Sequence, residues 1–222
     1  MTLATPCSKP YHHGDLRQAL LDATRDLLVE GGIQAASLRA VARRAGVTNR
    51  APYHHFQDKN SLLAAVAADG FSKLTQQTKE YLEEAGHDPL DRLTSIGLAY
   101  IDFAHTHPGE FQVMFCHEVC DPEEHPDRAC ASESCFDLLL NTIMGNARVP
   151  VPEDHLLSLA VSAWSSVHGF ATLRLQEHFQ NKPEIRVERL AHHLCRRVAN
   201  GIALEVGLLN AVPGSADRLP AN

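Results

Sequence analysis

The sequence predicts an all-α protein. Apolar residues recur every three or four positions over most of the 222 residues, and no stretch alternates as a half-buried β-strand would. Gly and Pro separate these periodic segments, as expected at helix ends. Between residues 37 and 59, two short apolar-periodic segments flank a glycine. This predicts a three-helix N-terminal domain with a helix-turn-helix, followed by a larger helical C-terminal domain.

The first helix is expected over residues 15–30, where Leu16, Leu20, Ala23 and Leu27 share one face. Further helices are expected over 59–85, 90–106, 131–146, 153–179 and 184–209, and a loop over 117–130. We divide the chain into a helix-turn-helix DNA-binding domain (1–60), a helical ligand-binding and dimerisation domain (61–210) and a disordered tail (211–222).

The spacing of residues 37–59 is that of a helix-turn-helix. Ser37 is a suitable N-cap for the first helix, and Gly46 can adopt the left-handed conformation that ends it. Thr48 is a candidate N-cap for the second helix, from about Asn49 to Phe56, with Pro52 in or just after its first turn. A second helix rich in polar and aromatic side chains suits the DNA major groove.

Charge is distributed unevenly along the chain. Residues 1–60 hold 8 Lys and Arg against 5 Asp and Glu, a balance of +3, whereas the remainder holds 12 against 22, a balance of −10. A basic head on an acidic body fits phosphate contact at one end only. On the second helix, Asn49, Arg50, Tyr53, His54 and His55 can donate to phosphates and base edges, and Lys59 suits a phosphate near the start of the next helix.

The same segment resembles the signature of TetR-type transcriptional repressors. The resemblance rests on the runs Gly46-Val47-Thr48, Pro52-Tyr53-His54-His55-Phe56 and Asp58-Lys59, preceded by Tyr11-His12-His13-Gly14-Asp15-Leu16-Arg17 and Gly31-Gly32. It implies that residues 48–51 open the recognition helix and face the groove, that Arg39 can reach a base, and that residues 9–13 can lie along the DNA backbone or in the minor groove. The side chains expected to bind DNA are then Ser37, Arg39, Thr48, Asn49, Arg50, Tyr53, His54, His55 and Lys59. Two positions depart from the family pattern. Arg50 stands where family members often have a small residue, and Pro52 stands where many have an aliphatic one.

A second resemblance concerns the run from Ala163 to Ala171, which is similar to a subgroup whose C-terminal domain is named for Trp, His and Gly (WHG). Trp164 and His168 are four residues apart and share a helix face. With Phe111, Met114 and Phe115 they are expected to line a pocket for a small apolar effector. The competing interpretation is that these aromatic side chains are ordinary core. The resemblance implies that ligand binding separates the two DNA-binding heads and lowers DNA affinity.

The last two long helices carry apolar stripes, namely Leu156, Ala160, Ala163 and Val167 on one and Val187, Leu190, Leu194, Val198 and Ile202 on the other. One interpretation is a four-helix homodimer interface, which the family resemblance also implies. The other is that both stripes are buried within the same subunit. A helix-turn-helix usually needs two copies to read two half-sites of double-stranded operator DNA.

Cysteine and histidine side chains are concentrated between residues 116 and 135. Cys116 and Cys120 would share a helix face if this segment were helical. Together with His117, His125, Cys130 and Cys135, they form a set that could bind zinc or copper or sense oxidants. The sequence therefore leaves open a metal- or redox-sensing repressor as the alternative to release by an organic effector. Incidental buried thiols explain the same residues without any function.

Composition and motifs exclude other classes. The chain contains no GxSxG, Gly-rich phosphate loop or HExxH motif, so we expect no catalytic activity, and we expect no cofactor. No continuous apolar run approaches the roughly 18 residues of a membrane-spanning helix, and the N-terminus lacks an apolar signal core. We therefore expect a cytoplasmic protein with reduced thiols and no membrane partner.

Overall fold

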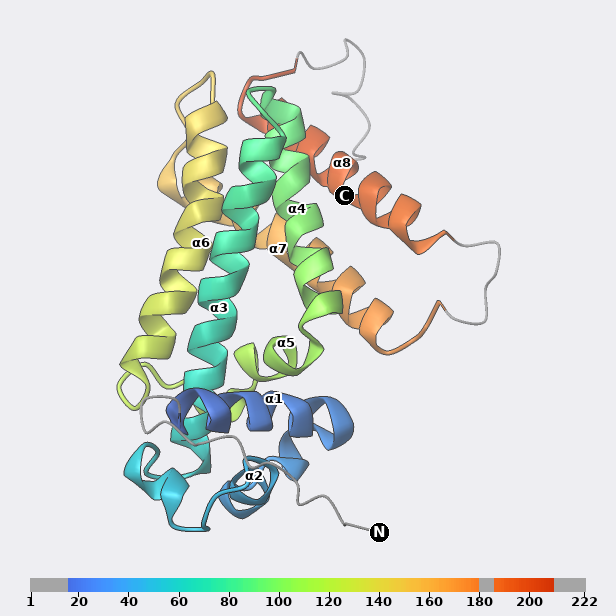
Figure 1. Cartoon of the computed structure of the whole chain (residues 1–222). Coiled ribbons are helices and arrows are strands. Elements are labelled where there is room, and N and C mark those ends of the chain that lie inside the picture. Colours follow the sequence, from blue (N-terminus) through green and yellow to red (C-terminus); the bar gives the residue numbers. More distant parts are fainter. Residues whose placement is uncertain (1–15, 180–185, 210–222) are drawn as a thin grey trace, which may run out of the picture.

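A computed structural model describes residues 16–179 and 186–209, and this part of the chain is built from helices alone (Figure 1). The all-α prediction is thus confirmed for the described residues. The expected tail over 211–222 and the backbone-contacting segment 9–13 lie outside them. In chain order the elements are α1 (Leu16–Ala35), α2 (Leu38–Arg44), the 3-10 helix η1 (Ala51–His54), α3 (Lys59–Glu84), α4 (Pro89–Thr106), α5 (Pro108–Met114), the 3-10 helix η2 (His117–Val119), α6 (Pro126–Asn146), α7 (Glu153–Leu175) and α8 (Val187–Glu205).

The head of the molecule consists of α1, α2, η1 and the first turns of α3, at the bottom of Figure 1. Leu20, Val41 and Leu62 from its three α-helices are fully buried in one apolar cluster. Local capping sets where the helices begin. The Ser37 hydroxyl accepts from the Ala40 N–H at 3.2 Å, and Asp58 and Ser61 form a reciprocal capping box at the start of α3.

Helix α3 joins the head to the body. Its first turn begins at Lys59, so the domain boundary predicted after residue 60 falls inside a continuous helix of 26 residues. The apolar cluster of the head continues along α3 to Phe71 and Leu74 and into the body. The head is therefore fixed to the body by a shared helix and a shared core.

The body surrounds α3 with the remaining helices. In Figure 1, α6 lies to the left of α3, whereas α7 and α8 extend to the right beyond α4. Helix α6 begins at Pro126, five residues earlier than the sequence predicted, because Pro126 occupies the first helical turn, where no N–H donor is required. The expected loop over 117–130 is correspondingly shorter.

The apolar stripe predicted on α7 faces the interior of the subunit. Ala160, Ala163 and Val167 are buried in the apolar clusters of the same chain. On α8, Ile202 is buried, Leu194 and Val198 are partly buried, and Leu190 is exposed. The stripes identified in the sequence thus mainly form the subunit core, and any interface must use other faces of these helices.

Candidate DNA-binding head and ligand cavity

The recognition element is shorter than predicted. Instead of an α-helix from Asn49 to Phe56, the structure has a turn at Asn49-Arg50 followed by the 3-10 helix η1. Pro52 explains the difference because it has no N–H with which to continue an α-helical hydrogen-bond ladder. Instead, the Ala51 N–H donates to the Thr48 carbonyl at 3.0 Å and the Tyr53 N–H to the Arg50 carbonyl at 3.2 Å, both three residues back.

This short element presents polar side chains outward and is anchored by two apolar ones. Pro52 and Phe56 are buried, whereas Tyr53 is 56% exposed. Seven further predicted DNA-binding residues are exposed and Lys59 is half-buried; the exposed ones are Ser37, Arg39, Thr48, Asn49, Arg50, His54 and His55. We call the surface formed by these residues and Tyr53 the reading surface.

Some arginine side chains of the head form ion pairs within the protein, and others do not. Arg44 contacts Glu30 with a nitrogen–oxygen distance of 2.5 Å and Asp26 at 3.6 Å, which ties α2 to α1. Within the described residues, Arg39, Arg43 and Arg50 make no ion pair and are exposed. Their guanidinium groups are therefore available for phosphates or base edges.

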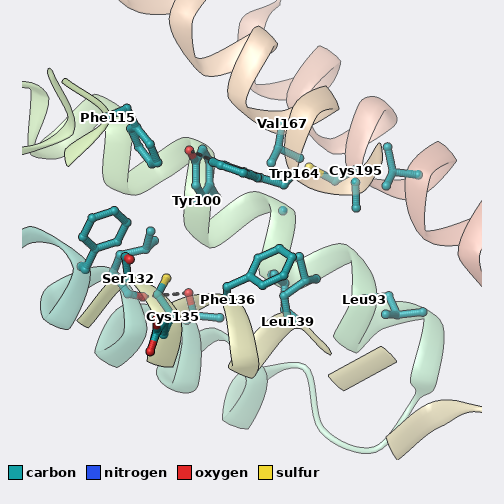
Figure 2. A pocket seen from close by; sticks show the side chains of 18 of the residues that line it. Leu93, Tyr100, Phe115, Ser132, Cys135, Phe136, Leu139, Trp164, Val167 and Cys195 are labelled. Atoms are coloured by element: carbon teal, nitrogen blue, oxygen red, sulfur yellow. Dashed lines mark hydrogen bonds between the residues drawn. The ribbon is translucent and has the colours of Figure 1, made fainter. Parts of the chain in front are cut away.

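The body contains an apolar cavity of about 420 Å³ between α3, α4, α6, α7 and α8. Figure 2 shows Phe136 and Leu139 of α6 on one wall and Trp164, Val167 and Cys195 on the opposite wall. Its volume is in the range of small-molecule pockets in proteins. The other residues of the wall include Phe71, Leu74, Leu93, Gly97, Tyr100, Phe115, Arg128, Ser132, Cys135, Val198 and Ile202.

Tyr100 connects the two residues of α7 that the sequence predicted for ligand binding. The Trp164 indole Nε1–H donates to the Tyr100 hydroxyl at 3.1 Å, and that hydroxyl lies 2.7 Å from His168 Nδ1. Because Tyr100 accepts from the indole, its own proton is free to donate to Nδ1 of a neutral His168. Burial raises the pKa of Tyr100 and lowers the pKa of His168, so both groups are uncharged at neutral pH.

The five predicted ligand residues do not all line this cavity. Trp164 and Phe115 do, whereas Phe111 and His168 line a second hollow of about 500 Å³ beside the end of α1, which Phe115 also borders. Met114 lines neither of them. It is fully buried against α3, where a Cβ added to Gly70 would lie 2.8 Å from its sulfur. The position of Met114 therefore gives no support to a ligand-binding role.

Helix α5 lies between the cavity and the head. The Phe111 ring packs edge-on against Tyr100, with ring centroids 5.6 Å apart, and stacks on His168 at 5.4 Å. On its other side, the Glu110 carboxylate lies 2.8 Å from Arg25 Nε of α1 and 3.1 Å from Lys73 Nζ of α3. Figure 1 shows α5 directly above α1. One short helix thus contacts the aromatic wall and the DNA-binding head.

Close packing of α5 on α1 depends on one glycine. A Cβ at Gly109 would lie 3.1 Å from the Arg25 carbonyl oxygen, which is tighter than ordinary van der Waals contact. A side chain at this position would therefore push the two helices apart.

The alternative metal site is not supported. In the described part of the chain, no three His, Cys, Asp or Glu side chains are grouped so that they could hold a metal ion, and this includes Cys116, His117 and Cys120. Cys116 is buried and its thiol lies 2.9 Å from Glu118; burial raises its pKa to about 11. A thiol with so little thiolate at neutral pH reacts slowly with oxidants. The Cys120 thiol is exposed and lies 3.0 Å from the Cys116 carbonyl.

Sequence reasoning missed Tyr100, Arg128, Ser132 and Phe136 as cavity residues. Arg128 fell in the segment expected to be a loop, and the helix containing Ser132 and Phe136 was expected to begin at 131. The signal that could have found the latter two is their spacing of four residues, which places them on one helix face. Which face turns toward α7 depends on tertiary packing.

A helical body carrying a helix-turn-helix head with unpaired arginines defines a class: a DNA-binding regulator. Comparison with known proteins agrees. Residues 20–66 match the family described as "Bacterial regulatory proteins, tetR family", and residues 93–198 match the "Tetracyclin repressor-like, C-terminal domain". The chain belongs to the TetR family of transcriptional regulators, which are not enzymes.

The similar sequences are themselves regulators. The HTH-type transcriptional regulator BetI of Serratia proteamaculans is 41% identical over 81 residues, which are 36% of this chain and 41% of BetI. The chain thus spans about two-fifths of the length of the curated BetI proteins that it matches. The uncharacterized HTH-type transcriptional regulator YobS of Bacillus subtilis is 23% identical over 173 residues, which cover 78% of this chain and 85% of YobS.

Solved structures agree on the fold. A protein of unknown function from Rhodococcus sp. RHA1 has a TM-score of 0.73 and 29% identity, covering 87% of this chain and 98% of that one. The TetR family transcriptional regulator PfmR of Thermus thermophilus has a TM-score of 0.62 and 18% identity over 82% and 97% of the two chains. At such low identity, the likeness to PfmR concerns the fold alone.

Proposed function

We propose that this regulator is a homodimeric repressor that binds an inverted-repeat operator and is released when a small organic effector enters the cavity beside Trp164. The observation that carries the effector part is the position of α5, which contacts the aromatic wall through Phe111 and the head through Glu110.

Dimerisation is supported by an exposed apolar face on α7 and α8. On α7, Leu157, Val161, Ser165, Gly169 and Leu173 are exposed at four-residue intervals, which is the spacing of a packing ridge. A Cβ added at Gly169, or at Gly201 of α8, would have no neighbour within 4 Å. Leu190 and Leu204 are exposed on α8. Large apolar side chains beside glycines suit close helix packing between two subunits.

The apolar character of α7 has a second interpretation. Among the described residues it is the one helix that is long and apolar enough to cross a membrane by length and composition, and only 22% of its apolar window is buried. The four serines between residues 158 and 166 interrupt the apolar run. We assign the exposed face to a second copy of the chain, because a helix-turn-helix protein usually binds DNA as a dimer that contacts two half-sites. Operator binding implies that the protein acts in the cytoplasm.

The dimer is tested with a charge placed on this face. Val161→Asp would bury two carboxylates in the interface, so we expect a monomer by light scattering at micromolar concentration. The matched control is Val29→Asp, at another exposed valine on α1, which should stay dimeric. The Val161→Asp variant should also lose high-affinity binding to the inverted repeat. A dimeric Val161→Asp variant would show that the interface lies elsewhere.

Release by an effector requires the ligand to bind the DNA-free conformation more tightly than the DNA-bound one. In this structure, a ligand pressing on Trp164 or Phe115 would act on the Tyr100–His168–Phe111 contacts, and α5 would transmit the displacement to α1. Coupling of 1–3 kcal/mol, or about 5- to 150-fold in operator affinity, is typical of such systems.

Two serines of α6 provide a matched test of the cavity. Ser132 lines the cavity, whereas Ser134 is exposed on the same helix. Ser132→Phe should fill the cavity, so that compounds which release the native protein from labelled operator no longer do so, while operator affinity itself is kept. Ser134→Phe should respond like the native protein. Equal effector responses in both variants would place the effector site outside this cavity.

A further inference from the structure

Within the described residues, Arg128 is the one Lys or Arg side chain that borders the apolar cavity. We propose that the effector is an amphipathic acid, with an anionic group such as a carboxylate bound by Arg128 and an apolar body filling the rest of the cavity. This inference rests on the effector site proposed above and names the chemical class that the site selects.

The guanidinium group of Arg128 is incompletely paired. Nη2 donates to the Met114 carbonyl at 2.9 Å and to the Cys120 sulfur at 3.6 Å, both uncharged acceptors, and the group lies over the Phe71 ring, 5.3 Å from its centroid. Its Nε is buried and has no hydrogen-bond acceptor within the described residues. Within the same residues, no carboxylate lies within 4.0 Å of it, whereas Arg25 and Arg174, whose side chains are 13% and 18% exposed, both have such a partner.

An arginine in this state favours an anion. Guanidinium presents five N–H donors and cannot lose its proton, so a partly buried one is stabilised by a charged acceptor. Carboxylates match its planar donor geometry and form the stronger, charge-assisted hydrogen bonds. Glu133 also borders the cavity, but it is five residues from Arg128 on α6, outside the turn-by-turn face that Arg128 shares with Ser132.

The cavity is polar at one end and apolar at the other. Arg128 and Ser132 occupy the first turns of α6, and Phe136 and Leu139 continue the same wall along the helix. Figure 2 shows Ser132 and Leu93 on opposite sides of the view, with Phe136 and Leu139 between them. Leu93, Val198 and Ile202 close the apolar part. A ligand with a charged head and an apolar tail would match both ends.

The test uses three alkyl probes of equal length: decanoate, decan-1-ol and decylamine. Trp164 is the only tryptophan of the chain and borders the cavity, so its fluorescence reports binding there. For the native protein we expect decanoate to bind at least tenfold more tightly than decan-1-ol, and decylamine most weakly, since a hydrogen bond to a charged group is worth about tenfold or more in affinity. Equal affinity for acid and alcohol, or preference for the amine, would overturn the proposal.

Variants locate the preference at Arg128. Arg128→Gln should lose the roughly tenfold advantage of decanoate and keep the affinity for decan-1-ol, whereas Arg128→Lys should retain part of the advantage. Arg148→Gln, an exposed arginine in the α6–α7 connection, is the charge-matched control and should behave as native. A preference for decanoate that survives in Arg128→Gln would refute the role of Arg128.

These outcomes are separable from the proposed function. Failure of all three probes to bind overturns the amphipathic-acid inference, and release by another class of effector would still be judged by the Ser132→Phe and Ser134→Phe pair. A native effector response in both serine variants would overturn the proposed site while leaving the binding measurements on the probes unaffected.

Discussion

Replacement of Glu110 by Gln tests the junction between the head and the body. The Glu110 side chain is only 6% exposed and contacts Arg25 of α1 at 2.8 Å and Lys73 of α3 at 3.1 Å. Gln has nearly the same shape but no charge. The substitution therefore removes the charge-assisted part of two contacts that hold α5 to the helices on either side of it.

The magnitude follows from what remains after the substitution. Both contacts are to the same carboxylate oxygen, Oε1; the Lys73 Nζ contact is a hydrogen bond, whereas Arg25 Nε forms an ion pair without a hydrogen bond. A hydrogen bond to a charged group contributes about 1.5–3 kcal/mol, and the Gln carbonyl oxygen can still accept from Lys73, so what is lost is the attraction of the carboxylate charge for the two cations. Asp69, which contacts both Arg25 and Lys73, continues to neutralise the two cations. We therefore expect a loss of about 2 kcal/mol in the free energy of unfolding, below the 3–5 kcal/mol of a fully buried pair left without compensation. For a protein of this size this lowers Tm by roughly 4–8 °C.

Urea denaturation followed by circular dichroism measures this difference. Asp22→Asn is the matched control, because Asp22 also pairs with Arg25 but its side chain is 60% exposed, and its loss should stay below about 1 kcal/mol. Glu110→Gln should in addition weaken the effect of effector on operator affinity. A Glu110→Gln variant as stable as Asp22→Asn, with unchanged coupling, would refute the assignment of α5 as the connecting element.

Further predictions concern the reading surface, the cavity and pH. Arg50→Ala should cost about 1–3 kcal/mol of DNA-binding free energy and relax the preference at one base position in a binding selection. Lys59→Ala should weaken binding to all DNA sequences alike and reduce the slope of log affinity against log salt concentration by about one. Gly97→Ala should lower the free energy of unfolding by about 1–3 kcal/mol, measured by thermal denaturation, because the alanine Cβ would lie 2.7 Å from the Cys195 sulfur. Burial lowers the pKa of His168 below its ordinary 6.5, so below that pH the unfolded chain binds a proton that the folded one does not. The free energy of unfolding should therefore fall as pH drops below about 6.5, and His168→Asn should reduce this pH dependence.

Local signals in the sequence were sufficient for most helices. Gly46, with φ of +70°, follows the end of α2 as predicted, and Ser37 caps α2. Pro residues caused the main errors. Pro52 reduced the recognition element to a 3-10 helix, whereas Pro126, assigned to a loop, begins α6. A proline can interrupt a helix or occupy its first turn, and only the surrounding fold determines which occurs.

The site was harder to predict than the fold. The four-residue spacing of Trp164 and His168 correctly placed them together, since both contact the Tyr100 hydroxyl. Tyr100 itself lies 64 residues away from Trp164 and carries no local signal for that contact. Burial of Met114 rather than exposure to the cavity depends on Gly70 of α3, which leaves room for its sulfur. Such choices are made by packing between helices distant in sequence.

The most direct measurement of the central claim is selection of bound fragments from random DNA, followed by affinity and stoichiometry on the best fragment at several salt concentrations. We expect an inverted repeat bound by two chains, with affinity falling steeply as salt rises because several phosphates are neutralised. Enrichment of no sequence, or binding of a single chain to a site without internal symmetry, would contradict a dimeric reader of operator DNA.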